Sequence, residues 1–353
     1  MSILIPVLLI SFLIFVHELG HFTAAKLFKV KVNEFAMFMG PAIAKWKWGE
    51  TQYSIRCIPI GGYCAMEGED GDSDNPRSFQ KADWWKRLII LVAGAFMNFV
   101  IGIIIVGVVL FSEPKYASAE IEAVDSWSTL CYEGGLQKGD TILNIDGTRI
   151  DIYEDFTLAT MKLPDGEYDI TVRRDGEKIK LKNVPMYRQE IEDADGNKTM
   201  LYGISFAVKD TTFWSVPGRV LPTALNHIKT VLVSLKLLIT GQVGLSEMMG
   251  PVGIVVAMSE TTGDDGLSVA AFMNMLRVTG FISMNLMVMN LLPIPAIDGG
   301  RVTALLITQA IEWITKKKLN PKYEAYIHGA GMVLLLVLTA LLFLKDFIVI
   351  FKR

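Results

Sequence analysis

Apolar residues gather in four long blocks along the chain, and polar residues interrupt the first and third blocks. A helix needs about 20 mostly apolar residues to cross the hydrocarbon core of a bilayer. The first block lacks a basic leader and runs into a histidine and a glutamate rather than a small-residue cleavage site, so we interpret it as a retained span. The pattern predicts four membrane-spanning helices, near residues 2–27, 88–111, 271–293 and 326–350.

Polar and apolar residues alternate between the first two predicted spans, on both sides of a Gly49-Glu50 turn. This alternation predicts a β-hairpin or short sheet over Asn33–Met66. Its aromatic residues are of the kind found at membrane interfaces, and backbone at membrane depth must be covered by protein or line a water-filled cavity. We therefore expect the hairpin to dip into the cytoplasmic leaflet beside a wet cavity. An ordinary soluble hairpin is the alternative.

Residues 117–208 have the pattern of a soluble domain that contains several strands. Short runs of strand-forming residues alternate there with Asp-Gly turn dipeptides, and residues 132–150 predict a short helix, a tight turn, a strand and a hairpin. Further along, apolar residues recur at helical spacing from Arg219 to Ile239, which predicts an amphipathic helix. This helix would either lie on the outer membrane surface or pack against the soluble domain.

Charged residues orient the chain and exclude some partners. Lysine and arginine concentrate after the first and third predicted spans, and positive charge near span ends marks the cytoplasmic side. We therefore expect the N-terminus, residues 112–270 and the C-terminus outside. A net charge of −3 without a basic stripe argues against a nucleic-acid partner. The three cysteines form no metal-binding doublet, and their odd number argues against a disulfide framework.

The first predicted span contains FVHELGHF, in which His17 and His21 are four residues apart. On a helix this spacing puts both imidazoles on one face, where they can bind one zinc ion, and Glu18 can act as general base toward the attacking water. A rise of 1.5 Å per residue from Ile3 puts the pair roughly 21–27 Å across a core of about 30 Å. Titratable groups at that depth are costly and usually functional. Two histidines that hydrogen-bond to other helices, with a neutralised glutamate, are the alternative.

Catalytic zinc usually has three protein ligands, so the sequence should supply one more. His227 lies on the predicted amphipathic helix, far from the cytoplasmic leaflet, and His328 at the start of the fourth span is better interpreted as an interfacial residue. Asp298 is better placed, in MNLLPIPAIDGGR, where prolines break the third span and glycines allow a sharp turn. We predict that Asp298 lies in an unwound stretch and is the third ligand. A helix cap just outside the membrane is the alternative.

Three further residues of the second and third spans are candidate neighbours of this site. The amide of Asn290 could donate to a substrate carbonyl or a developing oxyanion, or bond to another helix. Gly94 and Asn98 have the spacing of a close helix contact, and we interpret them as packing residues that could also face the site.

Together these residues resemble the site-2 protease family of intramembrane zinc metallopeptidases, of the bacterial RseP/RasP type. The resemblance rests on three motifs in order, HELGH, GAFMN and NLLPIPAIDGG, and extends to the segments IPIGGY and GPVGI. Phe38-Met39-Gly40 departs from the more glycine-rich pattern of relatives. The resemblance implies a catalytic base, Zn²⁺ ligands and substrate-binding residues. These are Glu18 as the base, His17, His21 and Asp298 on Zn²⁺, and Asn290, Asn98, Gly61 and Gly62 at the substrate.

The implied fold class is a multi-pass α-helical membrane protein with four transmembrane helices, a membrane-associated β-hairpin and one extracytoplasmic PDZ-like α+β domain. The expected segments are 1–32 (first transmembrane helix), 33–87 (hairpin and linker), 88–116 (second transmembrane helix), 117–210 (PDZ-like domain), 211–268 (amphipathic helix and GPVGI segment), 269–302 (third transmembrane helix) and 303–353 (cytoplasmic loop and fourth transmembrane helix).

The resemblance implies cleavage of single-span membrane proteins within the bilayer of the bacterial cytoplasmic membrane, after a first cut outside. An anti-sigma factor or a signal-peptide remnant would be the substrate. Two other classes of function stay open. One is a catalytically silent PDZ scaffold, against which the intact Glu18 argues. The other is an ordinary metalloprotease tethered to the membrane, against which the depth of His17 argues.

Overall fold

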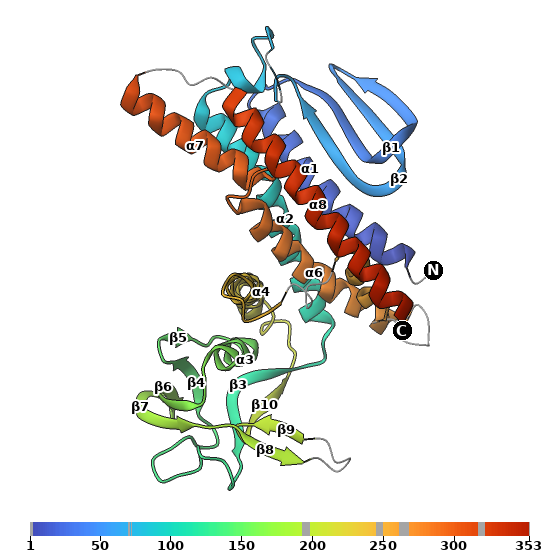
Figure 1. The fold of residues 1–353 in the computed structure, drawn as a ribbon. Coiled ribbons are helices and arrows are strands. Elements are labelled where there is room, and N and C mark those ends of the chain that lie inside the picture. Colours follow the sequence, from blue (N-terminus) through green and yellow to red (C-terminus); the bar gives the residue numbers. More distant parts are fainter. Residues whose placement is uncertain are drawn as a thin grey trace. The chain divides into compact units, whose positions relative to one another are not determined.

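The computed structural model describes residues 3–69, 71, 73–192, 198–244, 250–260, 268–316 and 322–352. The chain divides into two compact units (Figure 1), one formed by residues 1–106 and 227–353 and the other by residues 107–226. The first unit contains most of the long apolar helices, and the second is rich in strands.

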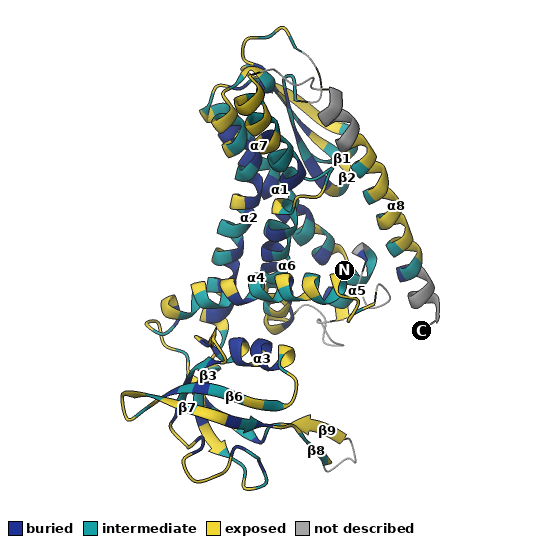
Figure 2. Ribbon diagram, turned by 60° about the vertical axis from the view of Figure 1, so that its left-hand side comes forward, coloured by how far each residue is buried: buried dark blue, intermediate teal, exposed yellow. Residues whose placement is uncertain are grey.

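Four helices of the described residues are long and apolar enough to cross a membrane. The four predicted spans are therefore present as helices. The last of them exposes most of the side chains in its apolar part, Gly329–Asp346 (Figure 2), as a helix that faces lipid would. The four helices are α1 (Leu4–Leu27), α2 (Trp84–Ser112), α6 (Val269–Leu291) and α8 (Lys322–Lys352).

Small residues let α2 approach both α1 and α6 closely. A Cβ on Gly20 of α1 would lie 2.3 Å from the Ala93 carbonyl oxygen, so no side chain fits there. On α6, Ser283 Oγ donates to the Asn98 carbonyl at 2.7 Å. Close backbone approach through small residues and hydrogen bonds between helices are the usual means of packing helices in a membrane.

Strands β1 (Val32–Trp48) and β2 (Thr51–Met66) form the predicted hairpin, with its turn at residues 49–50. Phe35 of β1 pairs with both Cys64 and Tyr53 of β2, so the first part of β1 lies between the two halves of β2. The hairpin is therefore folded back on itself into a broader sheet than a simple two-strand ribbon.

This sheet lies along α1. Near the end of α1, Lys26 Nζ donates to Glu50 Oε1 at 2.9 Å, and towards its start Ser11 Oγ donates to the Pro59 carbonyl at 2.6 Å. The stretch of helix between these two contacts is roughly 22 Å long at 1.5 Å per residue. The sheet thus accompanies a candidate membrane span over most of its length, and it carries exposed apolar side chains. These are Met39, Ile43, Ile55, Ile58 and Ile60.

The second unit is a sheet with strand order β10-β3-β4-β6-β7, in which β5 pairs with β4. Its core is formed by buried aliphatic residues, among them Ile121, Ile142 and Ile170. A separate pair of strands, β8 and β9, follows β7. The elements are β3 (Lys115–Val124), β4 (Thr141–Ile145), β5 (Thr148–Arg149), α3 (Tyr153–Lys162), β6 (Gly166–Arg174), β7 (Glu177–Met186), β8 (Gln189–Glu192), β9 (Lys198–Leu201) and β10 (Ile204–Asp210).

One expectation for this unit is wrong, and one of its helices was not predicted. The short helix predicted after Tyr132 is wrong, because the chain forms turns there with positive φ at Gly134 and Gly139, 85° and 89°. The turn before β4 is instead held by Asp140, which is fully buried and pairs with Arg174 at 2.7 Å. The sequence analysis also missed α3, whose first turn carries two acidic residues, a common helix-start signal. The predicted Asp195-Gly196 turn lies outside the described residues.

Three further helices and one 3-10 turn complete the elements that the structure describes. The predicted amphipathic helix is α4 (Pro217–Ile239), and α5 (Pro251–Glu260) begins within the GPVGI segment. A short 3-10 turn, η1 (Phe79–Lys81), precedes α2. The expectation of a loop after the third span is wrong, because α7 (Asp298–Thr315) is a helix that begins at Asp298 itself.

Candidate metal centre

His17, His21 and Asp298 point their ligand atoms at one another. His17 Nε2 and His21 Nε2 are 3.1 Å apart, and Asp298 Oδ2 lies 2.9 Å from the first and 3.3 Å from the second. Both histidines are buried, and the Asp298 side chain is 20% exposed. The structure therefore brings together the residues that the sequence analysis selected, from a candidate span and from the start of α7.

These distances fit a zinc ion. Zinc bonds of about 2.0–2.1 Å in a tetrahedron separate neighbouring ligand atoms by roughly 3.3 Å. The three separations here, 2.9 to 3.3 Å, are close to that value. Among the residues that the structure describes, this is the one group of three histidine, cysteine or acidic side chains with such geometry.

The second contact of His21 fixes which of its nitrogens can bind a metal. Its Nδ1 lies 2.8 Å from the Ile90 carbonyl oxygen of α2. A carbonyl only accepts, so Nδ1 carries a proton, and in the neutral tautomer Nε2 is the nitrogen whose lone pair faces Asp298. Asp298 Oδ2 is buried, and the two imidazole Nε2 atoms lie 2.9 and 3.3 Å from it. A metal ion bound among these three atoms would take the lone pairs of both rings and of the carboxylate.

His17 is held by two asparagines. Asn98 Nδ2 of α2 and Asn290 Nδ2 of α6 each lie 3.3 Å from His17 Nδ1. The buried Asn98 Oδ1 has no hydrogen-bond partner. Rotating this amide by half a turn would let Oδ1 accept from His17 Nδ1–H, which leaves Nε2 free as a metal ligand. Both asparagines thus lie beside the predicted site, and Gly94 lies directly against the two rings.

The segment before α7 brings Asp298 to the histidines. The prolines end α6 at Leu291, and Ala296 adopts a left-handed conformation with φ of 81°. Gly299 then packs so closely that a Cβ would lie 2.1 Å from the Leu292 carbonyl oxygen. Asp298 is therefore the first residue of a helix rather than part of an unwound stretch, because the tight turn before it ends one residue earlier.

Glu18 of α1 lies against strand β2. A Cβ on Gly62 would be 3.8 Å from Glu18 Cγ and 2.9 Å from the Ala36 carbonyl oxygen. Gly61 precedes it with φ of 76°, a conformation that favours glycine. Gly62 thus keeps the strand thin where it passes Glu18, and Gly61 faces Met39.

The two other histidines are not part of this group. The His227 ring lies edge-on to Phe281, with ring centroids 5.4 Å apart. The side chain of His328 lies outside the described residues. The sequence analysis missed the Ile90 carbonyl as a partner of His21, and no sequence signal marks it, because every residue carries a carbonyl.

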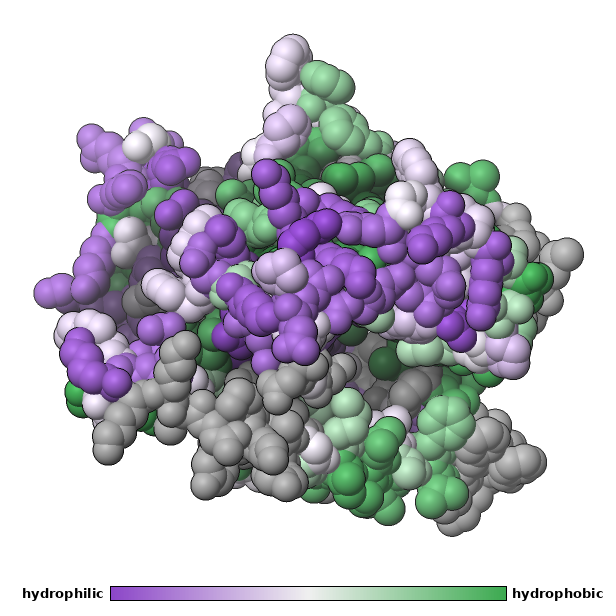
Figure 3. All heavy atoms as spheres, turned by 90° about the horizontal axis from the view of Figure 1, so that it is seen from above, coloured by the Kyte–Doolittle hydropathy of each residue, from purple (hydrophilic) through white to green (hydrophobic). Residues whose placement is uncertain are grey.

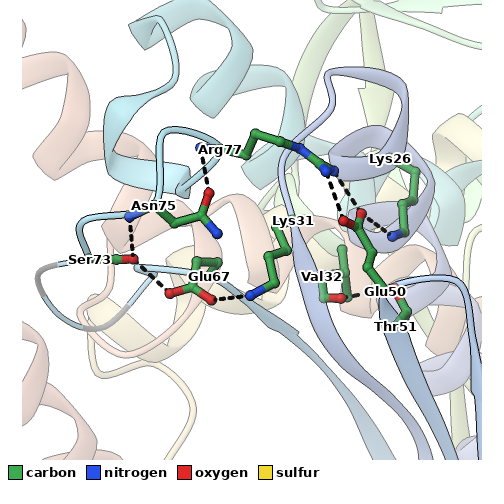
Figure 4. Close-up of polar contacts among 9 residues, drawn as sticks. All are labelled: Lys26, Lys31, Val32, Glu50, Thr51, Glu67, Ser73, Asn75 and Arg77. Atoms are coloured by element: carbon green, nitrogen blue, oxygen red, sulfur yellow. Dashed lines mark hydrogen bonds and ion pairs between the residues drawn. The ribbon is translucent and has the colours of Figure 1, made fainter.

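A charged network surrounds the hairpin turn (Figure 4). Glu50 accepts from both terminal nitrogens of Arg77, at 2.7 and 2.8 Å, and pairs with Lys26. The hydrogen bonds from Arg77 and Lys26 lower the pKa of Glu50 to about 2. A surface cavity of about 520 Å³ opens here, with Trp48 and Tyr53 in its wall and none of the three candidate metal ligands among its lining residues. Seen from above, hydrophilic side chains form a band with hydrophobic ones on either side (Figure 3).

Comparison with known proteins connects this geometry with a family. The sequence pattern of the family described as Peptidase family M50 matches residues 5–338. A protein of Clostridium acetobutylicum named "Putative zinc metalloprotease" is 36% identical over 98% of this chain and 97% of its own length. A protein of the same description from Fusobacterium nucleatum is 34% identical over 98% of both chains. The "Regulator of sigma-W protease RasP" of Bacillus subtilis is 25% identical over 94% of both chains.

Proposed function

Because this chain belongs to Peptidase family M50, the site-2 proteases, and is a membrane-integral zinc metalloprotease, we propose that it cleaves peptide bonds within the membrane-spanning segments of single-span proteins. One observation carries this proposal. His17 and His21 lie on a helix long and apolar enough to cross a membrane, and both approach Asp298 within 3.3 Å. A reaction centre on such a helix has membrane-embedded peptide bonds within its reach.

In this proposal His17 and His21 hold Zn²⁺ through Nε2, and Asp298 holds it through Oδ2. The Ile90 carbonyl keeps the His21 ring in the required orientation. When bound, Zn²⁺ lowers the pKa of a coordinated water toward about 7 and polarises the scissile carbonyl. Three protein ligands would leave the fourth position for water, as in catalytic zinc sites.

Glu18 is the proposed general base. It follows a zinc ligand directly in the chain and lies against strand β2. Its carboxylate takes the proton of the attacking water and later gives it to the leaving amine. The role needs a carboxylate beside the ligands but not on the metal, and the direct succession of His17 and Glu18 on one helix supports it.

Strand β2 is the proposed binding site for the substrate chain. A helical substrate hides its amides in its own hydrogen bonds, so it must unwind before cleavage. An extended segment could pair with the edge of β2 by strand addition, where Gly62 passes Glu18 and Gly61 precedes it in the strand. Asn290 and Asn98 would then face the scissile carbonyl from α6 and α2 and stabilise the developing oxyanion.

The proposal extends to topology and partners. The β1–β2 sheet dips into the cytoplasmic leaflet of the bacterial cytoplasmic membrane, because it follows α1 and exposes apolar side chains. The strand-rich unit is a single PDZ-like domain outside, which admits substrates already shortened by a first cut. The name of the Bacillus subtilis relative contains "Regulator of sigma-W", which supports an anti-sigma factor as substrate, with a signal-peptide remnant as the other substrate class.

The proposal is tested with the purified full chain in detergent. Wild type and Glu18→Gln are compared for bound zinc and for cleavage of a single-span substrate with a shortened outer segment. Glu18→Gln should retain zinc and lose at least roughly 10³-fold in cleavage rate, since no other carboxylate occupies the same position. Glu67→Gln, which changes a half-buried carboxylate directly after the hairpin, should cleave as wild type does. Equal cleavage by Glu18→Gln and wild type would reject the proposal.

A further inference from the structure

Arg301 connects the start of α7 with the end of the hairpin. Its Nη1 is paired with Glu69 Oε1, across 232 positions of sequence. The second oxygen of Glu69 accepts from the Met66 backbone amide at 3.4 Å. The pair is largely shielded from solvent, with 29% of the arginine side chain and 17% of the glutamate side chain exposed. Shielded pairs are weakened by salt less than exposed pairs.

Each partner is attached to an element of the reaction centre. Arg301 follows Asp298 by three residues in the first turn of α7, and its backbone amide bonds to the Ile297 carbonyl at 3.3 Å. Glu69 lies three residues after Met66, the last residue of β2. This is the strand that passes Glu18 at Gly62. The ion pair therefore joins the helix that carries the metal-facing carboxylate to the strand that passes the proposed base.

Asp298 lies between an irregular segment and the anchored part of α7. Between the end of α6 and Asp298 the chain lacks helical structure and passes through positive φ at Ala296. The next turn of α7 is anchored by Leu305, which is 3% exposed and shares a hydrophobic core with Val32 and Met66 of the hairpin. Arg301 lies between Asp298 and this anchor, on the side of α7 that meets the hairpin.

We propose that Arg301 is a positioning residue, which through Glu69 holds Asp298 at a fixed place relative to strand β2. The inference rests on the proposed function, because it takes Asp298 as a metal ligand and β2 as the substrate strand. Asp298 and β2 are then parts of one rigid arrangement. Loss of the pair lets the α7 start shift, and a shift of the carboxylate by a fraction of an ångström weakens metal binding and lowers the rate.

Charge reversal tests the proposal. Full-length Arg301→Glu, Glu69→Arg and the double variant are compared with wild type for zinc retention against a chelator and for kcat and KM. Each single variant should hold zinc roughly 10–100-fold more weakly, as residues that orient metal ligands typically do, with kcat lowered more than KM is raised. The double variant should recover at least roughly tenfold of that loss, because the two groups act as a pair. Arg301→Lys keeps the charge and should stay near wild type.

A neighbouring pair provides the matched control. Lys31 pairs with Glu67 at 3.0 Å (Figure 4), so this pair joins the two ends of the same hairpin to each other rather than to α7. Lys31→Glu should leave zinc retention unchanged. Wild-type zinc retention by Arg301→Glu, or no recovery in the double variant, would overturn the proposal. Arg301→Gln serves if Arg301→Glu fails to fold. Zinc retention is measured without cleavage, so this result is separate from the Glu18→Gln test.

Discussion

Gly94 of α2 lies in contact with the ring of His21 of α1. A Cβ built on Gly94 would be 2.4 Å from His21 Nε2 and 2.7 Å from His17 Cε1. No side chain fits in that space. The bare backbone at this position is what allows both imidazoles to turn toward Asp298.

Gly94→Ala should therefore abolish the metal centre without unfolding the helices. The added methyl group would displace the His21 ring, and we expect zinc content and cleavage rate to fall at least roughly tenfold, as when an outer contact of a ligand is lost. Gly107→Ala is the matched control on the same helix, since its nearest neighbour is Val220 Cγ2 at 3.8 Å. Full zinc content in Gly94→Ala would show that the rings do not need this space.

Asp346 of α8 caps α5. It is 5% exposed, and its two oxygens accept from the Gly250 and Gly253 backbone amides at 3.1 and 2.8 Å. Asp346→Ala should lower the free energy of unfolding by about 3 kcal/mol, because two buried hydrogen bonds to a charged group are lost. Thermal unfolding of the full chain in detergent measures it.

Asp346→Asn is the graded comparison for this cap. The amide keeps one of the two acceptor oxygens, so its loss of stability should be about half as large. Gly250→Ala should also destabilise, because its Cβ would lie 2.5 Å from Asp346 Oδ2. An Asp346→Ala protein as stable as wild type would mean that the cap contributes nothing in the membrane.

The attachment of the hairpin turn should depend on pH. The pKa of Glu50 is about 2, below its ordinary value of 4.5, because Arg77 and Lys26 hydrogen-bond to its ionised form. The stabilisation is therefore complete above pH 4.5 and is lost as the pH falls toward 2. Hydrogen exchange of the turn should accelerate over that window in wild type. Glu50→Gln should show the fast exchange at every pH, and a pH-independent wild type would contradict this account.

Local spacing in the sequence was enough to select the residues that meet at the centre. His17 and His21 share a helix face at four-residue spacing, which is a local property. Asp298 could be selected because the prolines before it break the third span. The roles of these residues as metal ligands stay predictions, while their proximity is a finding.

The sequence did not reveal contacts that depend on distant chain segments. The apolar pattern around Asp346 predicted only a span, because its partners are two backbone amides 93 and 96 positions away. The helix α7 was missed because Gly299 and Gly300 follow directly on its first residue, and glycine disfavours helix. There the close packing of the glycines against the preceding loop outweighs their low propensity.

The most direct test of the central claim is the zinc content of Asp298→Ala beside wild type, measured on full-length protein purified without added metal. The account predicts about one zinc per wild-type chain, with X-ray absorption showing nitrogen and oxygen ligands only, and a loss of at least roughly tenfold in affinity for Asp298→Ala. Zinc content and affinity equal to wild type in Asp298→Ala would show that the histidines hold their metal without this carboxylate, and would contradict the account.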